Sequence, residues 1–308
     1  MPMAFLSRPT PLKRPTLLIV GCGDVGLRVA RLLRGRWRLL GLTSSHPRMA
    51  LLREAGVRPL LGDLDRPASL GRLAGLADAV LHLAPPPSGG LTDPRTANLV
   101  GALMRGTRVR RLVYASTSGV YGDCGGERID ETRPIRPSTD RARRRADAEA
   151  RLRGYGRACG VTVTLLRIPG IYAPGRAGGD PRERLMRGTP VLAATDDVYT
   201  NHIHADDLAR ACVAALHRGR PQRVVHASDA SELKMGDYFD LAADLFGLPR
   251  PPRIDRAQAE RTLGAATLSF MGESRRLANG RLLHELGVRL RYPRVHEGLL
   301  ALSGAASP

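Results

Sequence analysis

One glycine-rich stretch constrains the fold more than any other part of the chain: Gly21-Cys22-Gly23-Asp24-Val25-Gly26. It follows the apolar run Thr16-Leu17-Leu18-Ile19-Val20 and leads into a helical pattern. The first glycine permits a tight turn, the second lets backbone approach a ligand, and the third lets the helix pack closely on the strand. An ordinary αβ turn is a poor alternative, because three glycines at a helix entrance cost conformational entropy. The pattern predicts a strand, turn and helix that hold the diphosphate of a dinucleotide.

Short apolar runs alternate with helical patterns through the first two-thirds of the chain, which is typical of a parallel sheet covered by helices. The predicted strands are Leu17–Val20, Arg38–Leu42, Val57–Leu61, Ala79–Leu83, Arg111–Ala115, Val161–Ile168 and Arg223–Ala227. The predicted helices include Gly26–Leu33, Pro47–Ala55, Pro67–Leu73, Pro94–Met104 and Thr139–Arg153. We therefore expect an α/β fold, a Rossmann-type doubly wound parallel sheet of about seven strands.

The chain is expected to divide into a disordered lead-in (1–15), a dinucleotide-binding Rossmann domain (16–168) and a smaller, mostly helical substrate-side region (169–308). One strand of the last region, residues 223–227, is expected to return to the sheet. Residues 170–200 are rich in Gly, Pro and Asp and are expected to form long loops near a site. Residues 228–308 are expected to hold two or three helices and little strand.

The composition restricts the environment of the protein. No run of about 18 uncharged apolar residues occurs, so we expect no membrane span. The four cysteines are scattered without C-x-x-C spacing, which disfavours a zinc site or a disulfide framework. We predict a cytoplasmic protein without a bound metal.

The formal net charge of +19 raises the question of a nucleic-acid partner. Nearly all the cations are arginines spread along the chain, since lysine occurs only at Lys13 and Lys234. No helix-turn-helix, zinc-finger or RNA-recognition signature accompanies them. We therefore expect no specific nucleic acid and no membrane as partners, although such a field would steer an anionic small molecule.

Beyond the glycine-rich stretch, further local patterns follow one another in the order that a known family has. They are Gly62-Asp63-Leu64, residues 113–122, 165–175 and 201–209, and a C-terminal set at 274–279, 285–287 and 297–299. With them the chain resembles an extended or atypical short-chain dehydrogenase/reductase of the NAD-dependent epimerase/dehydratase family, from about Thr16 to Leu300. The resemblance implies an NAD(P)-dependent oxidoreductase, epimerase or dehydratase. Its substrate would be a small carbonyl or alcohol, with a nucleotide sugar as the family default.

The segment after the second strand bears on the choice of cofactor. An acidic residue there would bind the ribose 2′-hydroxyl and favour NAD. Thr43, Ser44 and Arg48 stand there instead, and hydroxyls with an arginine could receive a 2′-phosphate. We therefore predict NADP in preference to NAD. The same segment could also cap the helix that begins near Pro47.

Further cofactor contacts are implied by the resemblance alone. Asp63 and Leu64 match the pair that contacts the adenine after the third strand. Ala84 follows the fourth strand, where the family's backbone passes the cofactor. An aspartate in a plain turn is the alternative for Asp63.

The catalytic pattern of the family is broken in this chain. The family uses a Ser or Thr, a tyrosine that acts as general acid/base, and a lysine four residues after the tyrosine. The hydroxyl survives as Thr117, but alignment places Arg141 and Arg145 at the tyrosine and lysine positions. No tyrosine in the chain has a lysine four residues later. Arg145 could still contact the nicotinamide ribose, whereas arginine cannot exchange protons near neutrality.

Another group must therefore move the proton if hydride transfer occurs. The candidates, in no order that the sequence justifies, are Tyr121, Asp123, Asp140, His202 and His204. Alternation would put the two histidines on one side of a short strand. A metal site built on them lacks a convincing third ligand.

The substrate-side residues implied by the resemblance are Ser116, Arg167, Tyr172 and His204. Arg167 could bind an anionic substrate together with Arg176 and either Arg275 or Arg276. Two functions remain open at this point: an enzyme, and a catalytically silent NADP(H)-binding module such as a redox-sensing regulator. The resemblance also implies that a homodimer could form through residues 94–104 and 139–153. The arginine run argues against this interface, because it would place like charges across a two-fold axis.

Overall fold

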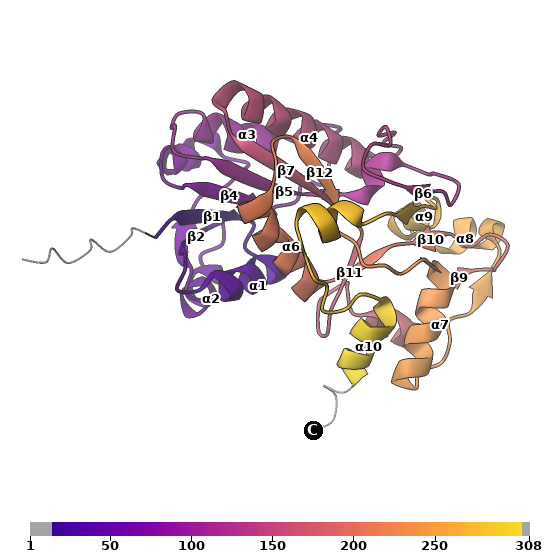
Figure 1. Cartoon of the computed structure of the whole chain (residues 1–308). Coiled ribbons are helices and arrows are strands. Elements are labelled where there is room, and N and C mark those ends of the chain that lie inside the picture. Colours follow the sequence, from indigo (N-terminus) through magenta and orange to yellow (C-terminus); the bar gives the residue numbers. More distant parts are fainter. Residues whose placement is uncertain (1–13, 304–308) are drawn as a thin grey trace, which may run out of the picture.

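The computed structural model describes residues 14–303, and its centre is a seven-stranded sheet (Figure 1). In spatial order the strands are β12 (Arg223–His226), β7 (Thr162–Ile168), β5 (Arg111–Thr117), β4 (Ala79–His82), β1 (Thr16–Val20), β2 (Arg38–Thr43) and β3 (Arg58–Leu61). All neighbours pair in parallel. The predicted doubly wound fold is confirmed, with all seven predicted strands. Most of the predicted lead-in, residues 1–13, lies outside the described residues.

The strand order explains where a ligand would bind. All five residues of β1 are buried, as expected for a parallel strand covered on both faces. β1 pairs with β4 on one side and with β2 on the other, so the order of the strands reverses at β1. In such sheets the crevice at the carboxyl ends beside the reversal is the usual binding place.

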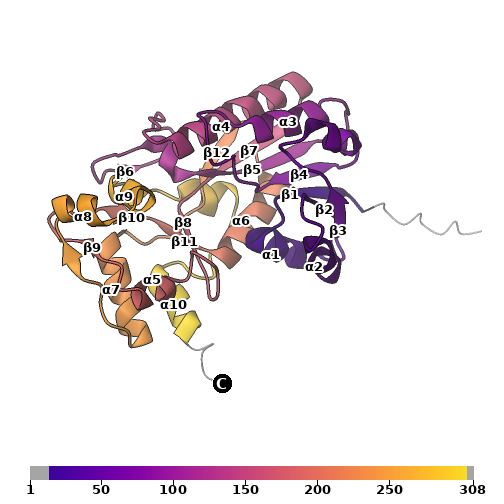
Figure 2. The ribbon, with the colours of Figure 1, turned by 180° about the vertical axis from the view of Figure 1, so that it is seen from behind.

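Helices form a layer on each face of the sheet (Figures 1 and 2). One apolar core joins the sheet to α1 (Asp24–Leu33), α2 (Arg48–Glu54) and α6 (Ala205–Arg218). The core on the other face includes η1 (Pro67–Leu73), α3 (Pro94–Leu103) and α4 (Asp140–Cys159). The helix predicted at Pro67–Leu73 is thus a 3₁₀ helix.

Helix α4 continues to Cys159, so its predicted end at Arg153 is wrong. The helix passes through Gly156, where a Cβ would lie 2.8 Å from Val163 Cγ2, so the missing side chain lets α4 sit close to β7. It ends at Gly160, which adopts the left-handed conformation with φ of 64°. At the other end, Thr139 accepts a hydrogen bond from Ala142 N over 3.2 Å.

The substrate-side region contains more regular structure than predicted. Its strands are β8 (Gly170–Tyr172), β9 (Val191–Leu192), β10 (Tyr199–Thr200), β11 (His202–His204), β13 (Leu233–Lys234), β14 (Arg253–Ile254) and β15 (Arg276–Leu277). Its helices, besides α6, are α5 (Pro181–Met186), α7 (Met235–Phe246), α8 (Arg256–Thr262), α9 (Ala265–Met271), α10 (Val295–Ser303) and the π-helical turn η3 (Arg281–Glu285). The long loops expected at 170–200 are therefore interrupted by β8, α5, β9 and β10. Within the described residues, four α-helices, rather than two or three, follow residue 228.

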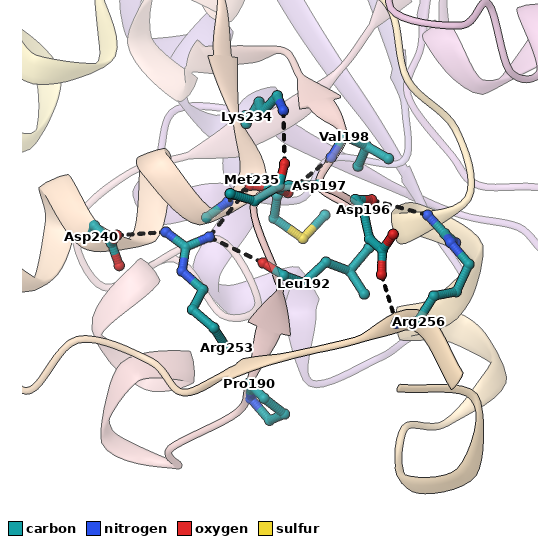
Figure 3. A network of polar contacts seen from close by, with 12 residues as sticks. Pro190, Leu192, Asp196, Asp197, Val198, Lys234, Met235, Asp240, Arg253 and Arg256 are labelled. Atoms are coloured by element: carbon teal, nitrogen blue, oxygen red, sulfur yellow. Dashed lines mark hydrogen bonds and ion pairs between the residues drawn. The ribbon is translucent and has the colours of Figure 1, made fainter. Parts of the chain in front are cut away.

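The short strands pair with segments distant in sequence. β8 pairs with β11, β9 with β14, β10 with β13, and β15 with β6 (Arg128–Ile129). Figure 3 shows how one arginine ties this region together: Arg253 on β14 reaches Asp240 on α7, Asp197, and the carbonyl of Leu192 on β9. The region stands beside the sheet in both views (Figures 1 and 2). No helix within residues 14–303 combines the length and apolarity needed to cross a membrane.

Candidate functional site

The conformation of the turn between β1 and α1 depends on its glycines. Gly21 has φ of +83°, and a Cβ there would lie 2.4 Å from Ala84 N, so the ends of β1 and β4 can approach only because this residue is glycine. A Cβ on Gly26 would lie 3.2 Å from Cys22 Sγ and 3.3 Å from Ile19 Cγ2, which is close helix-on-strand packing. The two residues thus have the steric roles that the sequence predicts.

The middle glycine faces empty space. A Cβ built on Gly23 meets no atom within 4 Å. Gly23 precedes α1, and no side chain caps the N–H groups of the first helical turn. An anion could therefore approach bare backbone at a helix N-terminus, which is the arrangement that a dinucleotide diphosphate requires. These residues fit that group.

A cavity of about 310 Å³ extends from this turn to the end of β5. We call it the smaller cavity. It is lined by residues of the turn, by Ser116 and Thr117 at the end of β5, and by Arg145 of α4. Arg145 Nη1 donates to the carbonyl of Ala115 over 2.7 Å and to the Tyr114 hydroxyl over 3.1 Å. The guanidinium is thus held beside the end of β5, and Arg145 is the residue for which the resemblance implies a contact with the nicotinamide ribose.

The segment after β2 lies next to the same turn. Arg48 Nη2 donates to the carbonyl of Cys22 over 2.9 Å. α2 begins at Arg48 without a side-chain cap, and Ser45 N donates to Thr43 Oγ1 over 3.2 Å within the segment. The alternative that these side chains cap α2 is therefore wrong, and Ser44 is exposed.

The pair after β3 is fixed by the neighbouring helix. Asn98 of α3 donates its Nδ2 to the carbonyl of Leu64 over 2.8 Å. Asp63 Oδ1 accepts from Asp65 N over 2.9 Å, so part of its carboxylate shapes the turn. Its role as an adenine contact stays a prediction.

A second cavity, of about 710 Å³, adjoins the first at the end of β5. We call it the larger cavity. Its lining comes from β8, from α5, from the segment that joins β10 and β11, and from α9 with the residues that follow it. Both cavities share four lining residues: Thr117, Pro169, Ile171 and Arg176.

Arg141 and Arg145, which the sequence comparison with the family predicts at the tyrosine and lysine positions, line different cavities. Arg141 lines the larger cavity, and its guanidinium lies 4.2 Å from the centre of the Phe270 ring. Arg145 lines the smaller cavity. Thr117 lies between them, and its Oγ1 accepts from Gly119 N over 3.2 Å.

Tyr121 is committed to a structural contact. His226 Nδ1 must donate to the carbonyl of Ala278, over 2.9 Å, so its Nε2 accepts the hydroxyl proton of Tyr121 over 2.6 Å. Burial raises the pKa of Tyr121 to about 12. Since Tyr121 lines neither cavity, this geometry gives it no access to a ligand.

The two aspartates considered for proton transfer also shape the backbone. Asp123 Oδ1 accepts from Gly125 N over 3.2 Å and from Ser274 N over 2.8 Å. Asp140 opens α4 and pairs with Arg143 over 3.2 Å. Neither lines the cavities.

The two histidines of β11 both pack against Tyr172, but they do different things. His204 is the N-cap of α6 and accepts from Asp206 N over 3.2 Å at its Nδ1. His202 lines the larger cavity and stacks on Tyr238 with ring centres 4.1 Å apart. Burial lowers the pKa of His202 to about 3, so its ring is neutral at neutral pH. Within residues 14–303 no three side chains gather as a metal site would require.

The other predicted substrate residues divide in the same way. Tyr172 lines the larger cavity. Arg167 is buried and lines neither cavity, because it forms a two-point ion pair with Glu149 of 3.1 and 2.8 Å. Ser116 donates to the same carboxylate over 2.6 Å. Arg167 thus belongs to a buried network behind the site, and Ser116 joins that network while also lining the smaller cavity.

The sequence reasoning missed Glu273, which is 8% exposed and lines the larger cavity. Its Oε1 accepts from the Ser138 hydroxyl over 3.0 Å and its Oε2 from Arg275 Nη1 over 2.9 Å. A Cβ built on Gly119 would lie 3.6 Å from Thr117 Oγ1 and 3.8 Å from Glu273 Oε2, so both groups face one small space. The sequence signal was modest: Glu273 directly precedes the C-terminal segment that begins at Ser274.

A glycine-rich β1–α1 turn at the reversal of a parallel sheet, joined at a hydroxyl on β5 to a second cavity, defines the class of short-chain dehydrogenase/reductase proteins. Residues 17–227 match the model of the NAD dependent epimerase/dehydratase family, and the chain belongs to that family.

Known relatives span nearly the whole chain. Protein YeeZ of Escherichia coli K12 is 25% identical over 290 residues, which cover 89% of this chain and 95% of YeeZ. A conserved protein of unknown function from Silicibacter pomeroyi DSS is 31% identical, with a TM-score of 0.80 over 96% of this chain and all of that one. The UDP-glucose 4-epimerase of Thermotoga maritima, solved with UDP-glucose, is 18% identical with a TM-score of 0.75, covering 94% of this chain and 97% of that one, and shows the shared fold.

Proposed function

We propose that this protein is an NAD(P)-dependent enzyme that oxidises, reduces or epimerises an anionic carbonyl or alcohol compound of the nucleotide-sugar type. The observation that carries the proposal is the junction of the two cavities at Thr117. A dinucleotide in the smaller cavity and a substrate in the larger one would meet there, and a reaction between two ligands needs them in contact.

The dinucleotide would be held by the glycine-rich turn, Arg48, the segment at Asp63, and Arg145. When bound, its nicotinamide ring supplies hydride acceptance or donation. Thr117 would orient the substrate oxygen through its hydroxyl. The place of Arg145 in the lining of the smaller cavity supports its contact with the nicotinamide ribose, the half of the missing lysine's role that needs no proton transfer.

Glu273 is the group that we propose for proton transfer. Arg141 cannot serve, because its guanidinium stays protonated. Asp123, Asp140 and Tyr121 are bound elsewhere and line neither cavity. A carboxylate can take the proton of a substrate hydroxyl in oxidation, or return it in reduction. The bonds from Ser138 and Arg275 would keep Glu273 directed toward the space beside Thr117.

Replacing Glu273 by glutamine should lower turnover by about 10²–10⁴-fold, the usual contribution of a general acid/base. The measurement is the rate of NADPH or NADH oxidation with the best carbonyl compound of a panel, as a function of pH. Nucleotide affinity should not change, because Glu273 lines only the larger cavity. Asp123→Asn is the matched control and should retain turnover; the opposite ranking of the two variants would refute this role.

The charge of the larger cavity supports an anionic substrate. Arg141, Arg184 and Arg187 line it, and within the described residues none of the three forms an ion pair with a carboxylate. The Nε of Arg184 is buried without a hydrogen-bond partner. Guanidinium groups that line a cavity without a carboxylate partner favour an anionic ligand.

The preference for NADP rests on Arg48 and the absence of a carboxylate at the end of β2. Replacing Arg48 by alanine should weaken NADPH binding by roughly tenfold, the value of a charge-assisted hydrogen bond of about 1.5 kcal/mol. NADH binding should change much less. Fluorescence titration of both nucleotides against both proteins measures this, and an equal loss for NADH and NADPH would contradict the preference.

A catalytically silent NADP(H)-binding module is the second candidate, favoured by the exchange of the tyrosine–lysine pair for Arg141 and Arg145. Nucleotide titration followed by a carbonyl and alcohol panel separates the two. Tight NADPH binding without turnover of any compound would favour the module, and failure to bind either nucleotide would exclude both.

A further inference from the structure

Arg176 lies where the two cavities meet. It belongs to the loop between β8 and α5, on the substrate side of the molecule. Of the four residues that line both cavities, it is the one with a charge. Its side chain is 23% exposed, so the guanidinium is accessible to a ligand while largely enclosed.

The loop holds Arg176 in a defined position. The N–H groups of Gly179 and Asp180 donate to the carbonyl of Arg176 over 2.8 and 2.9 Å. A Cβ on Gly179 would lie 2.7 Å from Arg176 Cδ, so the aliphatic part of the side chain lies directly over this bare glycine. The stem is therefore directed by local packing before any ligand arrives.

The guanidinium reaches across to the glycine-rich turn. Arg176 Nη1 donates to Asp24 Oδ2 over 2.6 Å, and Asp24 is the first residue of α1. The other oxygen of Asp24 accepts from Arg28 Nε over 2.9 Å. Asp24 thus fixes the end of Arg176 beside Gly23, whose Cβ direction is empty.

This arrangement answers an electrostatic difficulty. A diphosphate at the start of α1 would lie beside the carboxylate of Asp24, and like charges repel. A guanidinium has five N–H donors in a planar fork, so one nitrogen can serve Asp24 while others remain for phosphate oxygens. Arg176 is placed to bridge the two anions.

We propose that Arg176 is a ligand of the dinucleotide diphosphate, contributed by the substrate-side region and positioned by Asp24. The inference rests on the proposed dinucleotide site. It extends that site beyond the first βα unit, since one side chain between β8 and α5 would touch the nucleotide and also line the substrate cavity.

The test uses the purified full chain and NADPH as the probe, with binding followed by fluorescence and checked by calorimetry. Arg176→Gln should weaken NADPH binding by about ten- to a hundredfold, the range for hydrogen bonds to charged groups. Arg176→Lys keeps the positive charge but loses the planar set of N–H donors. Its affinity for NADPH should lie between those of the wild type and Arg176→Gln. Arg182→Gln is the control: Arg182 pairs with Asp180 over 2.6 Å, lies on the neighbouring helix and lines neither cavity.

Each outcome decides something. Wild-type affinity in Arg176→Gln, or an equal loss in Arg182→Gln, would overturn the role of Arg176 while leaving the dinucleotide site intact. Thermal unfolding of each variant shows whether a loss of binding reflects unfolding; if Arg176→Gln is unfolded, wild-type affinity in a folded Arg176→Lys overturns the role. If the wild-type protein binds neither NADPH nor NADH, the proposed function fails with it.

Discussion

Replacing Glu149 by alanine is expected to lower the free energy of unfolding by about 3–5 kcal/mol, because it leaves the charge of Arg167 buried and unpaired. The side chains of the pair are only 5% and 3% exposed. The same carboxylate accepts from Ser116 over 2.6 Å, so its loss leaves three buried donor atoms unsatisfied, one of Ser116 and two of Arg167. Glu149 also links α4 to β5 and β7, and the effect should therefore be global rather than local.

Urea unfolding followed by circular dichroism measures this change. The control is Asp244→Ala, which breaks an ion pair with Arg250 whose side chains are 51% and 61% exposed, and which should leave the unfolding curve nearly unchanged. The double variant Glu149→Leu/Arg167→Met should recover much of the loss, since apolar side chains of similar volume often replace a buried pair without penalty. A single variant as stable as the wild type would mean that Arg167 finds another partner or reaches solvent.

Replacing Gly23 by alanine is expected to weaken dinucleotide binding by roughly ten- to a hundredfold without unfolding the protein. The new methyl group would occupy the space into which the diphosphate must come, and overfilling a packed site costs about 1–3 kcal/mol. The fold should tolerate it, because Gly23 has φ of −85° and a Cβ there meets no atom within 4 Å.

The measurement is again fluorescence titration with NADPH, with thermal unfolding recorded for the same sample. Gly101→Ala provides the control: this glycine of α3 also has open space around its Cβ position but is distant in sequence from the turn. Its NADPH affinity should equal that of the wild type. If Gly23→Ala binds NADPH as tightly as Gly101→Ala, the diphosphate does not lie against this turn.

The central sheet could be predicted because each of its strands is a local signal. Runs such as Leu17–Val20 are continuously apolar, and a strand covered on both faces needs little information from elsewhere in the chain. The signal for the glycine-rich turn is equally local, because the spacing of the glycines predicts the close contacts that the structure contains at Gly21 and Gly26. The predicted fifth strand stopped at Ala115, whereas β5 continues to Thr117, whose place at the strand end came from the family resemblance.

The rest of the fold and of the candidate site depends on contacts between segments that are distant in the sequence. The periodicity of a sequence does not indicate such contacts. Two-residue strands such as β9 and β14 form only because they pair with each other. Nothing near Tyr121 in sequence indicates that His226 accepts a hydrogen bond from its hydroxyl, or that Glu149 forms an ion pair with Arg167. Glu273 was missed for the same reason, because its significance comes from Thr117, far away in the chain.

The positions of Arg141 and Arg145 on α4 have a consequence for how such a protein can diverge. One helical turn separates them, yet Arg141 lines the cavity proposed for the substrate and Arg145 lines the cavity proposed for the nucleotide. We therefore expect that a substitution at Arg141 changes which compounds are accepted while the affinity for the nucleotide stays the same. The two properties could then evolve separately although both depend on one helix.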